Sequence, residues 1–185
     1  MRQGQLIGRL GVLALGLAAS LALTTATAVR AAEVEIVRDH YGVPHVYAAT
    51  THDLFLGYGY AVAEDRLFQM EMAKRSFTGR VAEVLGPDFV AHDKGTRSLS
   101  SPERIQRQIE ELGPDDRAIL AGYAAGVNRR IAEVLAPGNR ERLLPKQFVD
   151  QGFEPEPWTE LDVAMIFVGT MANRFSDASS EINNL

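Results

Sequence analysis

The stretch Thr51–Ser76, THDLFLGYGYAVAEDRLFQMEMAKRS, has helical periodicity over more residues than any other part of this chain. Thr51 is placed to cap such a helix, and Gly57 and Gly59 near its start are typical of close backbone packing. Apolar residues recur every three or four positions, the spacing of one buried helix face: Leu54, Tyr58, Ala61, Val62, Phe68 and Met72. We therefore expect a long helix whose first turns pack closely.

Short extended segments precede this helix. Residues 33–37 alternate polar and apolar side chains, and residues 43–48 form a second extended run. The two runs predict a β-hairpin, with Asp39 and Gly42 in its connection.

Further helices follow along the chain. The expected elements are an irregular surface loop over 87–101, a charged helix over 102–112, a helix from 114 to the Pro137-Gly138 break and a connector over 139–158. Thr159 and Asp162 resemble a capping box that begins a last helix. Residues 163–172 are almost all apolar, so this helix should be buried on all sides, against partners that these 185 residues do not fully supply. We therefore expect the front part of a longer chain.

The N-terminal residues have the order of a secretory signal peptide. Residues 1–9 carry two arginines and no acid, residues 10–23 are an unbroken run of apolar and small residues, and small residues follow. The apolar run is shorter than the roughly 20 residues of a bilayer span, so a retained membrane anchor is the weaker alternative. We expect cleavage after Ala31, or else after Ala28, and export to the periplasm.

The composition is that of an acidic globular protein. The chain has 185 residues, 24 Asp and Glu against 19 Lys and Arg, a net charge of −5 and 46% hydrophobic residues. Removing residues 1–31 takes away three arginines and no acid, so 16 basic and 24 acidic residues remain, a net charge of −8. This balance argues against nucleic-acid binding. The lack of cysteine excludes disulfides, thiolate zinc sites and a cysteine nucleophile.

The sequence contains no catalytic constellation. It has no Gly-x-Ser-x-Gly elbow, no His-Glu-x-x-His motif and no phosphate-binding glycine loop. The histidines do not share the spacing of metal ligands, and we expect them on surfaces or in turns: His40, His45, His52 and His92.

Asp65 falls on the apolar face of the long predicted helix. A carboxylate in that position must be paired or protonated. We interpret Asp65 as half of a buried ion pair that fixes the helix, rather than as a catalytic acid, with three candidate partners: Arg66, Arg75 and Arg80.

One cluster near the C-terminus suits ligand binding. Met171, Arg174 and Phe175 stand at i, i+3 and i+4 and share one side of a helix. Two soft apolar groups beside a guanidinium suit a pocket for an apolar ligand with a carboxylate, although Met and Phe at this spacing also occur in ordinary cores. Asp177 and Glu181, four residues apart, are either metal-binding carboxylates or solvated acids.

Several ordered motifs resemble the penicillin acylase family. Residues 36–48, IVRDHYGVPHVYA, are similar to the family's opening, and GYGY at 57–60 with AEDRLFQMEM at 63–72 is similar to its next signature. LLPKQF at 143–148 and AMIFVGTMANRFSD at 164–177 are similar to two later motifs. The resemblance covers essentially all of residues 33–185.

The resemblance implies an exported precursor of the N-terminal nucleophile hydrolases, made of signal peptide, α chain, spacer and β chain. Residues 32–185 would be part of the α chain of an α+β protein. Its four-layer αββα core would be completed by the β chain, while this part alone is mainly helical with a short β-hairpin. The nucleophile would be the serine that opens the β chain, with its own α-amine as base. No catalytic residue is therefore assigned here, and this part alone should be inactive.

The family's motifs also imply site residues and partners. Met171 and Phe175 would line the acyl pocket, Arg174 would be the gate beside it, and Glu181 would be the one α-chain ligand of a structural Ca²⁺. The implied reaction is hydrolysis of the side-chain amide of penicillin G and related phenylacetyl amides. The implied partners are the β chain and a small-molecule amide, with no nucleic acid, and no membrane once the signal is removed.

Two alternatives remain open at this point. One is an acylase of the same fold for N-acyl-homoserine lactones or cephalosporins. The other, from a different class, is an exported binding module that uses an apolar pocket without catalysis.

Overall fold

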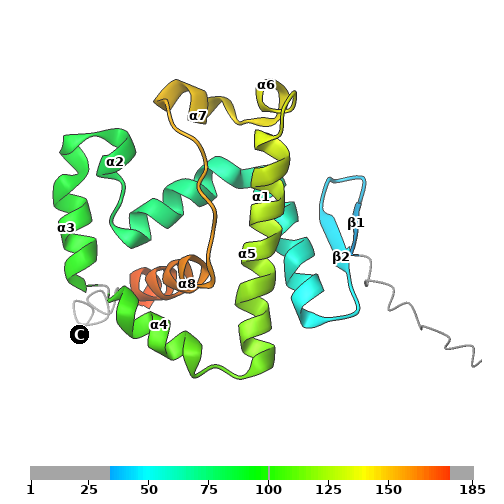
Figure 1. Cartoon of the computed structure of the whole chain (residues 1–185), viewed down its shortest axis with the longest axis horizontal. Coiled ribbons are helices and arrows are strands. Elements are labelled where there is room, and N and C mark those ends of the chain that lie inside the picture. Colours follow the sequence, from blue (N-terminus) through cyan, green and yellow to red (C-terminus); the bar gives the residue numbers. More distant parts are fainter. Residues whose placement is uncertain (1–33, 100, 176–185) are drawn as a thin grey trace, which may run out of the picture. The chain divides into compact units, whose positions relative to one another are not determined.

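The computed structural model describes residues 34–99 and 101–175, with side chains described as far as Met171. Within these residues a hairpin is followed by a series of helices (Figure 1). The elements are β1 (Glu35–Arg38), β2 (Pro44–Tyr47), α1 (Thr51–Thr78), α2 (Ala82–Leu85), the 3₁₀ helix η1 (Pro87–Phe89), α3 (Val90–Leu99), α4 (Pro102–Glu110), α5 (Pro114–Leu135), α6 (Arg140–Leu143), α7 (Lys146–Gln151) and α8 (Glu160–Phe175). The mainly helical character and the short hairpin confirm the expectation, whereas the predicted signal peptide lies outside the described residues.

The hairpin connection has the predicted turn residues. Asp39 Oδ1 accepts hydrogen bonds from the backbone N–H groups of Tyr41 at 2.9 Å and Val43 at 3.0 Å. Gly42 has a φ of 80°, a conformation that glycine adopts without steric cost. The local sequence therefore closes the turn, and β1 and β2 pair antiparallel with Ile36 opposite Val46.

One face of the hairpin packs on α1. Ile36 and Val46 are half-buried there because Gly57 has no side chain: a Cβ built on it would lie 2.5 Å from Val46 Cγ1. The other face is uncovered within the described part of the chain, since Val37 and Tyr47 are 45% and 58% exposed.

The long helix α1 confirms the prediction, with two differences. Its N-cap is Thr50, not Thr51. Thr50 has the extended backbone that a cap needs, and its hydroxyl accepts a hydrogen bond from Asp53 N at 3.1 Å. The helix also bends at Arg66, where φ is −137° and ψ is 24°. It ends at Gly79, which has a φ of 65°.

Helices α1 and α5 are in close backbone contact through glycines. A Cβ on Gly59 would lie 2.3 Å from the carbonyl oxygen of Tyr123, and one on Gly126 would lie 2.0 Å from that of Leu56. Gly122 stands equally close to the backbone of His52. The close packing inferred from the first glycines of α1 is confirmed, with the hairpin beside Gly57 and α5 beside Gly59.

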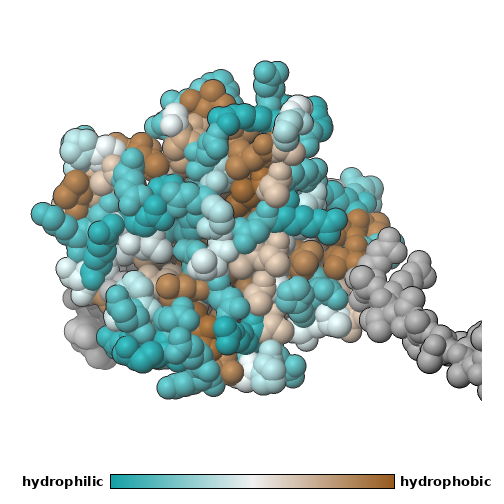
Figure 2. All heavy atoms as spheres, in the orientation of Figure 1, coloured by the Kyte–Doolittle hydropathy of each residue, from teal (hydrophilic) through white to brown (hydrophobic). Residues whose placement is uncertain are grey.

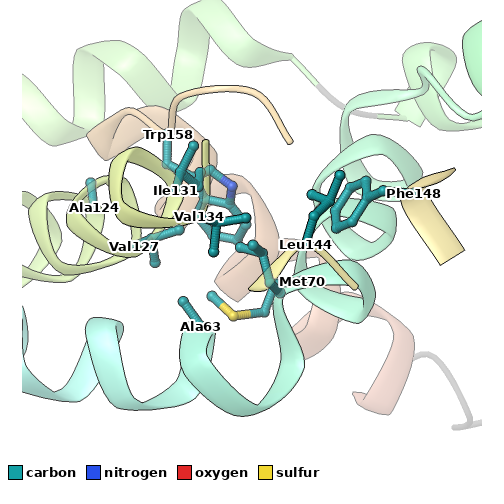
Figure 3. Close-up of a cluster of buried hydrophobic side chains, with 10 residues drawn as sticks. Ala63, Met70, Ala124, Val127, Ile131, Val134, Leu144, Phe148 and Trp158 are labelled. Carbon is teal, nitrogen blue, oxygen red and sulfur yellow. The ribbon is translucent and has the colours of Figure 1, made fainter. Parts of the chain in front are cut away.

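The core forms where α5, α1 and the segment before α8 meet (Figure 3). The apolar side of α5 points inward, and Val127, Ile131 and Val134 are buried. The buried residues of this cluster are Ala63, Leu67, Met70, Ala124, Val127, Ile131, Val134, Leu144, Phe148 and Trp158. A second, smaller cluster joins α4 to α8 through Ile105, Ile109, Ala164 and Met165.

The expectation of an irregular loop over residues 87–101 is wrong, because η1 and α3 occupy most of it. Asp93 of α3 is buried, and its two carboxylate oxygens accept hydrogen bonds from the backbone N–H groups of Val81 at 3.0 Å and Ala82 at 2.8 Å. A polar side chain therefore anchors α3, so the segment lacks the apolar periodicity on which the prediction relied. The expected connector 139–158 likewise contains two short helices, α6 and α7.

Helix α8 begins as predicted. The backbone N–H of Thr159 donates to Asp162 Oδ2 at 2.8 Å, and that of Asp162 donates to the Thr159 hydroxyl at 3.2 Å, which is a reciprocal cap. Among the described residues, no helix combines the length and the apolar character that crossing a membrane requires.

The close contact at Gly126 predicts how an added methyl group at this position changes stability. Gly126→Ala should lower the free energy of unfolding of the purified protein by about 3 kcal/mol, because the new Cβ would overlap the backbone of α1. Gly95→Ala is the control, since nothing lies within 4 Å of its Cβ in α3, and it should stabilise by about 0.5–1 kcal/mol through helix propensity. Denaturant unfolding of both variants checks this, and equal effects would refute the close contact.

Candidate functional site

The candidate site lies on the second half of α8. The first half of this helix is anchored: Arg117 Nε of α5 is 3.0 Å from Glu160 Oε2, and Ala164 and Met165 are buried against α4. The backbone stays helical through Phe175. Met171, Arg174 and Phe175 therefore lie on one helix, as their spacing predicted.

The apolar surface of α8 is uncovered in its second half. Phe167, Val168 and Met171 are 61%, 43% and 40% exposed. The expectation of a helix buried on all sides is therefore not met within the described residues. Position 171 is four residues after 167 and three after 168, so Met171 lies beside both and the three side chains form one continuous surface. Such an exposed apolar surface is suited to binding an apolar group or a protein partner.

The remaining predicted site residues are not described in side-chain detail. Arg174 and Phe175 belong to the last turn of α8, and their side chains lie beyond those described. Asp177 and Glu181 lie outside the described residues. Their assignments to the pocket and to the metal remain predictions.

A buried charge cluster, missed in the sequence, holds the segment before α8. Glu71, Lys74 and Arg75 of α1 are buried. Glu71 Oε2 is 2.9 Å from Lys74 Nζ, and Glu71 Oε1 is 3.0 Å from Arg75 Nε. Buried charges require partners of this kind because desolvation would otherwise destabilise the fold. The spacing i, i+3 and i+4 was the signal that could have revealed the cluster.

This charge cluster reaches Glu156, three residues before Thr159. Arg75 donates to Glu156 Oε1 at 2.8 Å, Arg80 donates to Oε2 at 2.8 Å, and Lys74 Nζ donates to the Glu156 carbonyl at 3.1 Å. The hydrogen bonds from Arg80, and then from Arg75, lower the pKa of Glu156 to about 2. The connector that carries α8 is therefore fixed to α1 by charge-assisted hydrogen bonds.

The interpretation of Asp65 as a buried ion pair is wrong. Its side chain is 47% exposed, and its partner is Arg38 of β1, with 2.9 Å between Arg38 Nη2 and Asp65 Oδ1. Glu64 pairs with the same guanidinium at 2.7 Å. The bend at Arg66 breaks the helical phase between Asp65 and the apolar residues after it. The sequence spacing across residue 66 therefore misplaced Asp65 on the buried face.

The histidines occupy the surface or turn positions expected of them. His45 Nε2 lies 3.4 Å from Asp39 Oδ2, and His52 Nδ1 lies 3.2 Å from Asp53 Oδ1. Within residues 34–99 and 101–175, no group of three or more His, Asp or Glu side chains is arranged to hold a metal ion.

Residues 33–185 match the model of a protein family described as penicillin amidase. Because the match covers most of the chain, the chain belongs to this family, which confirms the resemblance of its motifs.

Named relatives agree with the family. The chain is 61% identical over 153 residues to penicillin G acylase of Escherichia coli, covering 83% of this chain and 18% of that protein. It is 39% identical over 127 residues to the penicillin acylase 2 proenzyme of Pseudomonas sp. (strain SE83), covering 69% and 16%. It is 31% identical over 137 residues to an acyl-homoserine lactone acylase of Pseudomonas aeruginosa, covering 74% and 16%. The chain thus spans less than a fifth of the length of these relatives.

A solved structure has a similar fold. The thermostable penicillin G acylase from Alcaligenes faecalis superposes with a TM-score of 0.73 and 52% sequence identity, covering 82% of this chain and 78% of that chain.

The low pKa of Glu156 predicts an acid-sensitive contact. Because the folded-state pKa lies below the ordinary 4.5, the ionised carboxylate stabilises the fold above pH 4.5, and this stabilisation is lost as the pH falls through about 2. Glu156→Gln should therefore lower the free energy of unfolding at pH 7 by about 1–2 kcal/mol, a value reduced for solvent screening because the side chain is 38% exposed. The difference in free energy of unfolding between this variant and the wild type should become smaller as the pH falls towards 2.

Urea unfolding at several pH values measures this loss. Glu154→Gln is the control, because Glu154 belongs to the same connector but pairs with Arg140 in a more exposed position. A pH-independent loss, or an equal loss in both variants, would contradict the role given to Glu156.

Proposed function

We propose that this chain is the α-chain part of an exported amidase. The amidase hydrolyses the side-chain amide of penicillin G and related phenylacetyl amides through an acyl-enzyme. The likeness to penicillin G acylase over most of residues 33–185 carries the proposal. The nucleophile is the N-terminal serine of a β chain, activated by its own α-amine. The chain alone is inactive because it contributes no reacting group.

The second half of α8 supplies one wall of the acyl pocket. Met171, on the uncovered apolar side of α8, supports this role. Phe175, on the same side of the helix, lines the pocket with it. Arg174 stands beside them as the gate, where its guanidinium can meet the carboxylate of an entering β-lactam. Burying an aromatic acyl group against Met and Phe contributes roughly 1.5–3 kcal/mol from apolar area.

The β chain of the same precursor covers the surfaces left open here. The exposed side of α8 and the uncovered face of the hairpin support this, because a soluble protein rarely leaves several apolar side chains together in water. Figure 2 shows hydrophobic atoms at the surface of the hairpin. Together the two chains complete the four-layer αββα arrangement of the N-terminal nucleophile hydrolases.

Glu181 contributes one ligand to a structural calcium ion. A carboxylate is the hard oxygen donor that Ca²⁺ prefers, and a single carboxylate supplies at most two of the six to eight oxygens required. The described residues of this chain offer no further cluster of ligands. The remaining oxygens come from the β chain and water, as the family resemblance implies, so the ion ties the two chains together.

The enzyme works in the periplasm. The basic, apolar and small-residue order of residues 1–31 supports export and removal of this segment.

The function is tested with the mature enzyme produced from the complete precursor. It should hydrolyse a phenylacetyl amide with a higher kcat/KM than a long-chain N-acyl-homoserine lactone. Phe175→Ala should shift the ratio of kcat/KM for phenylacetyl over a bulkier acyl group by roughly 10-fold, because an apolar wall of the pocket is lost.

Phe89→Ala, on η1, is the matched control and should leave this ratio unchanged. An enzyme that prefers the lactone would favour the alternative acylase, and no turnover of either substrate would favour a binding module. An unchanged ratio with a large fall in melting temperature would show that Phe175 is an ordinary core residue.

Calcium is tested separately. Glu181→Ala should lower the calcium content of the purified enzyme and slow conversion of the precursor into two chains, because the ion loses its α-chain ligand. Elemental analysis and gel electrophoresis measure both, with Glu141→Ala as a control for loss of an exposed carboxylate. Full calcium content with normal maturation in Glu181→Ala would refute the assignment.

A further inference from the structure

The ends of α1, α3, α4 and α8 enclose a cavity of about 430 Å³. This volume is within the range of small-molecule sites. Its apolar lining includes residues of all four helices: Phe77 of α1, Leu99 of α3, Ile105 of α4 and Val168 of α8. Figure 1 shows these helix ends gathered on one side of the molecule, away from the hairpin. Met171, the acyl-pocket residue whose side chain is described, does not line this cavity, although Val168, one turn before it, belongs to both surfaces.

The apolar wall of the cavity is the ring of Phe77, which packs on α8 at Gly169. A Cβ built on Gly169 would lie 2.2 Å from Phe77 Cδ1 and 2.8 Å from two further ring atoms. The phenyl ring therefore rests directly on the backbone of α8, a position that any side chain at 169 would prevent. An aromatic ring held against a backbone in this way offers a flat apolar surface to a ligand.

The polar side chains that line the cavity are suited to binding an anion. Arg104 and Gln108 both line it and lie one turn apart on α4. Neither side chain makes a hydrogen bond or an ion pair with another described residue, and both are exposed. None of the described lining residues is acidic. A guanidinium with free donors beside an amide N–H₂ matches a carboxylate.

Ser76 and His92 complete this polar side. The Ser76 hydroxyl and His92 Nε2 are 3.2 Å apart, so the two groups satisfy each other. They line the cavity together with Arg104 and leave it with positive or neutral groups only, among the described residues.

We infer that this cavity is a second binding site, distinct from the acyl pocket, for a small organic acid with one carboxylate and one apolar group. Arg104 binds the carboxylate, with Gln108 donating beside it, and the apolar group lies against Phe77, Ile105 and Val168. This site goes beyond the proposed function, which does not require it. Phenylacetate, the acid that the proposed hydrolysis would release, belongs to this ligand class.

The test is calorimetric titration of the mature two-chain enzyme with phenylacetate, and with 2-phenylethanol as an uncharged probe. The wild-type enzyme should bind phenylacetate at two sites. Arg104→Gln should weaken one of them by about 10- to 100-fold, because a charge-assisted hydrogen bond is lost, and should leave the other unchanged. Binding of 2-phenylethanol should not respond to this substitution.

Two further variants sharpen the test. Arg107→Gln removes the same charge from the same helix at a position that does not line the cavity, and should leave both sites intact. Gly169→Ala should abolish the same site as Arg104→Gln by displacing Phe77. Arg104 is on the surface, so its variant remains informative if Gly169→Ala fails to fold.

A single phenylacetate site in the wild-type enzyme, or two sites unaffected by Arg104→Gln, would overturn the inference. Failure of the proposed function has a different signature. The enzyme would then not hydrolyse phenylacetyl amides, while a phenylacetate site sensitive to Arg104→Gln would still be measured.

Discussion

The backbone contact between α1 and α5 is the constraint on which the rest of the structure depends. Gly59 on one helix, and Gly122 and Gly126 on the other, let each helix approach the carbonyl oxygens of its neighbour. At this separation the larger side chains beside the glycines, such as Val127 and Ile131, reach across into one core. The core then receives Phe148 and Trp158 from the later segments. A wider helix pair would leave that core incompletely packed, and interiors do not tolerate such voids.

The charge cluster of Glu71, Lys74 and Arg75 determines where the connector before α8 packs on α1. An apolar core accepts many arrangements of similar volume, whereas a buried carboxylate with two cations must find its partners in one geometry. Here that geometry includes Glu156, so the connector can lie along α1 in one position. The reciprocal cap at Thr159 follows three residues later, and α8 leaves the connector in a defined direction. The charges therefore fix the placement of α8 through Glu156 in addition to stabilising the fold.

Sequence reasoning succeeded where one local signal governed the structure. Periodicity or capping residues alone predict five elements, without tertiary information: the hairpin, α1, α4, α5 and the start of α8. It failed where a polar contact between distant residues decided the outcome. Asp93 anchors α3 through backbone N–H groups more than ten residues away, and Asp65 pairs with Arg38 across 27 residues. For the site, spacing placed Met171, Arg174 and Phe175 on one helix, while their roles came from family resemblance and not from geometry.

The charged residues in the two halves of α1 differ in how far along the chain their partners lie, and this sets an order in which those contacts can form. The half before Arg66 joins the hairpin through Arg38 and Asp65, which are 27 residues apart. The half after it needs Glu156, which is 81 residues beyond Arg75. During synthesis the first half can form its hairpin contacts early, because closing a short loop costs little entropy, whereas its backbone contacts wait for Gly122 and Gly126 of α5. The second half has to keep Glu71, Lys74 and Arg75 hydrated until about half of the described chain has followed. A growing chain of this protein can therefore form the contacts between the hairpin and α1 well before those that join α1 to α5 and to Glu156.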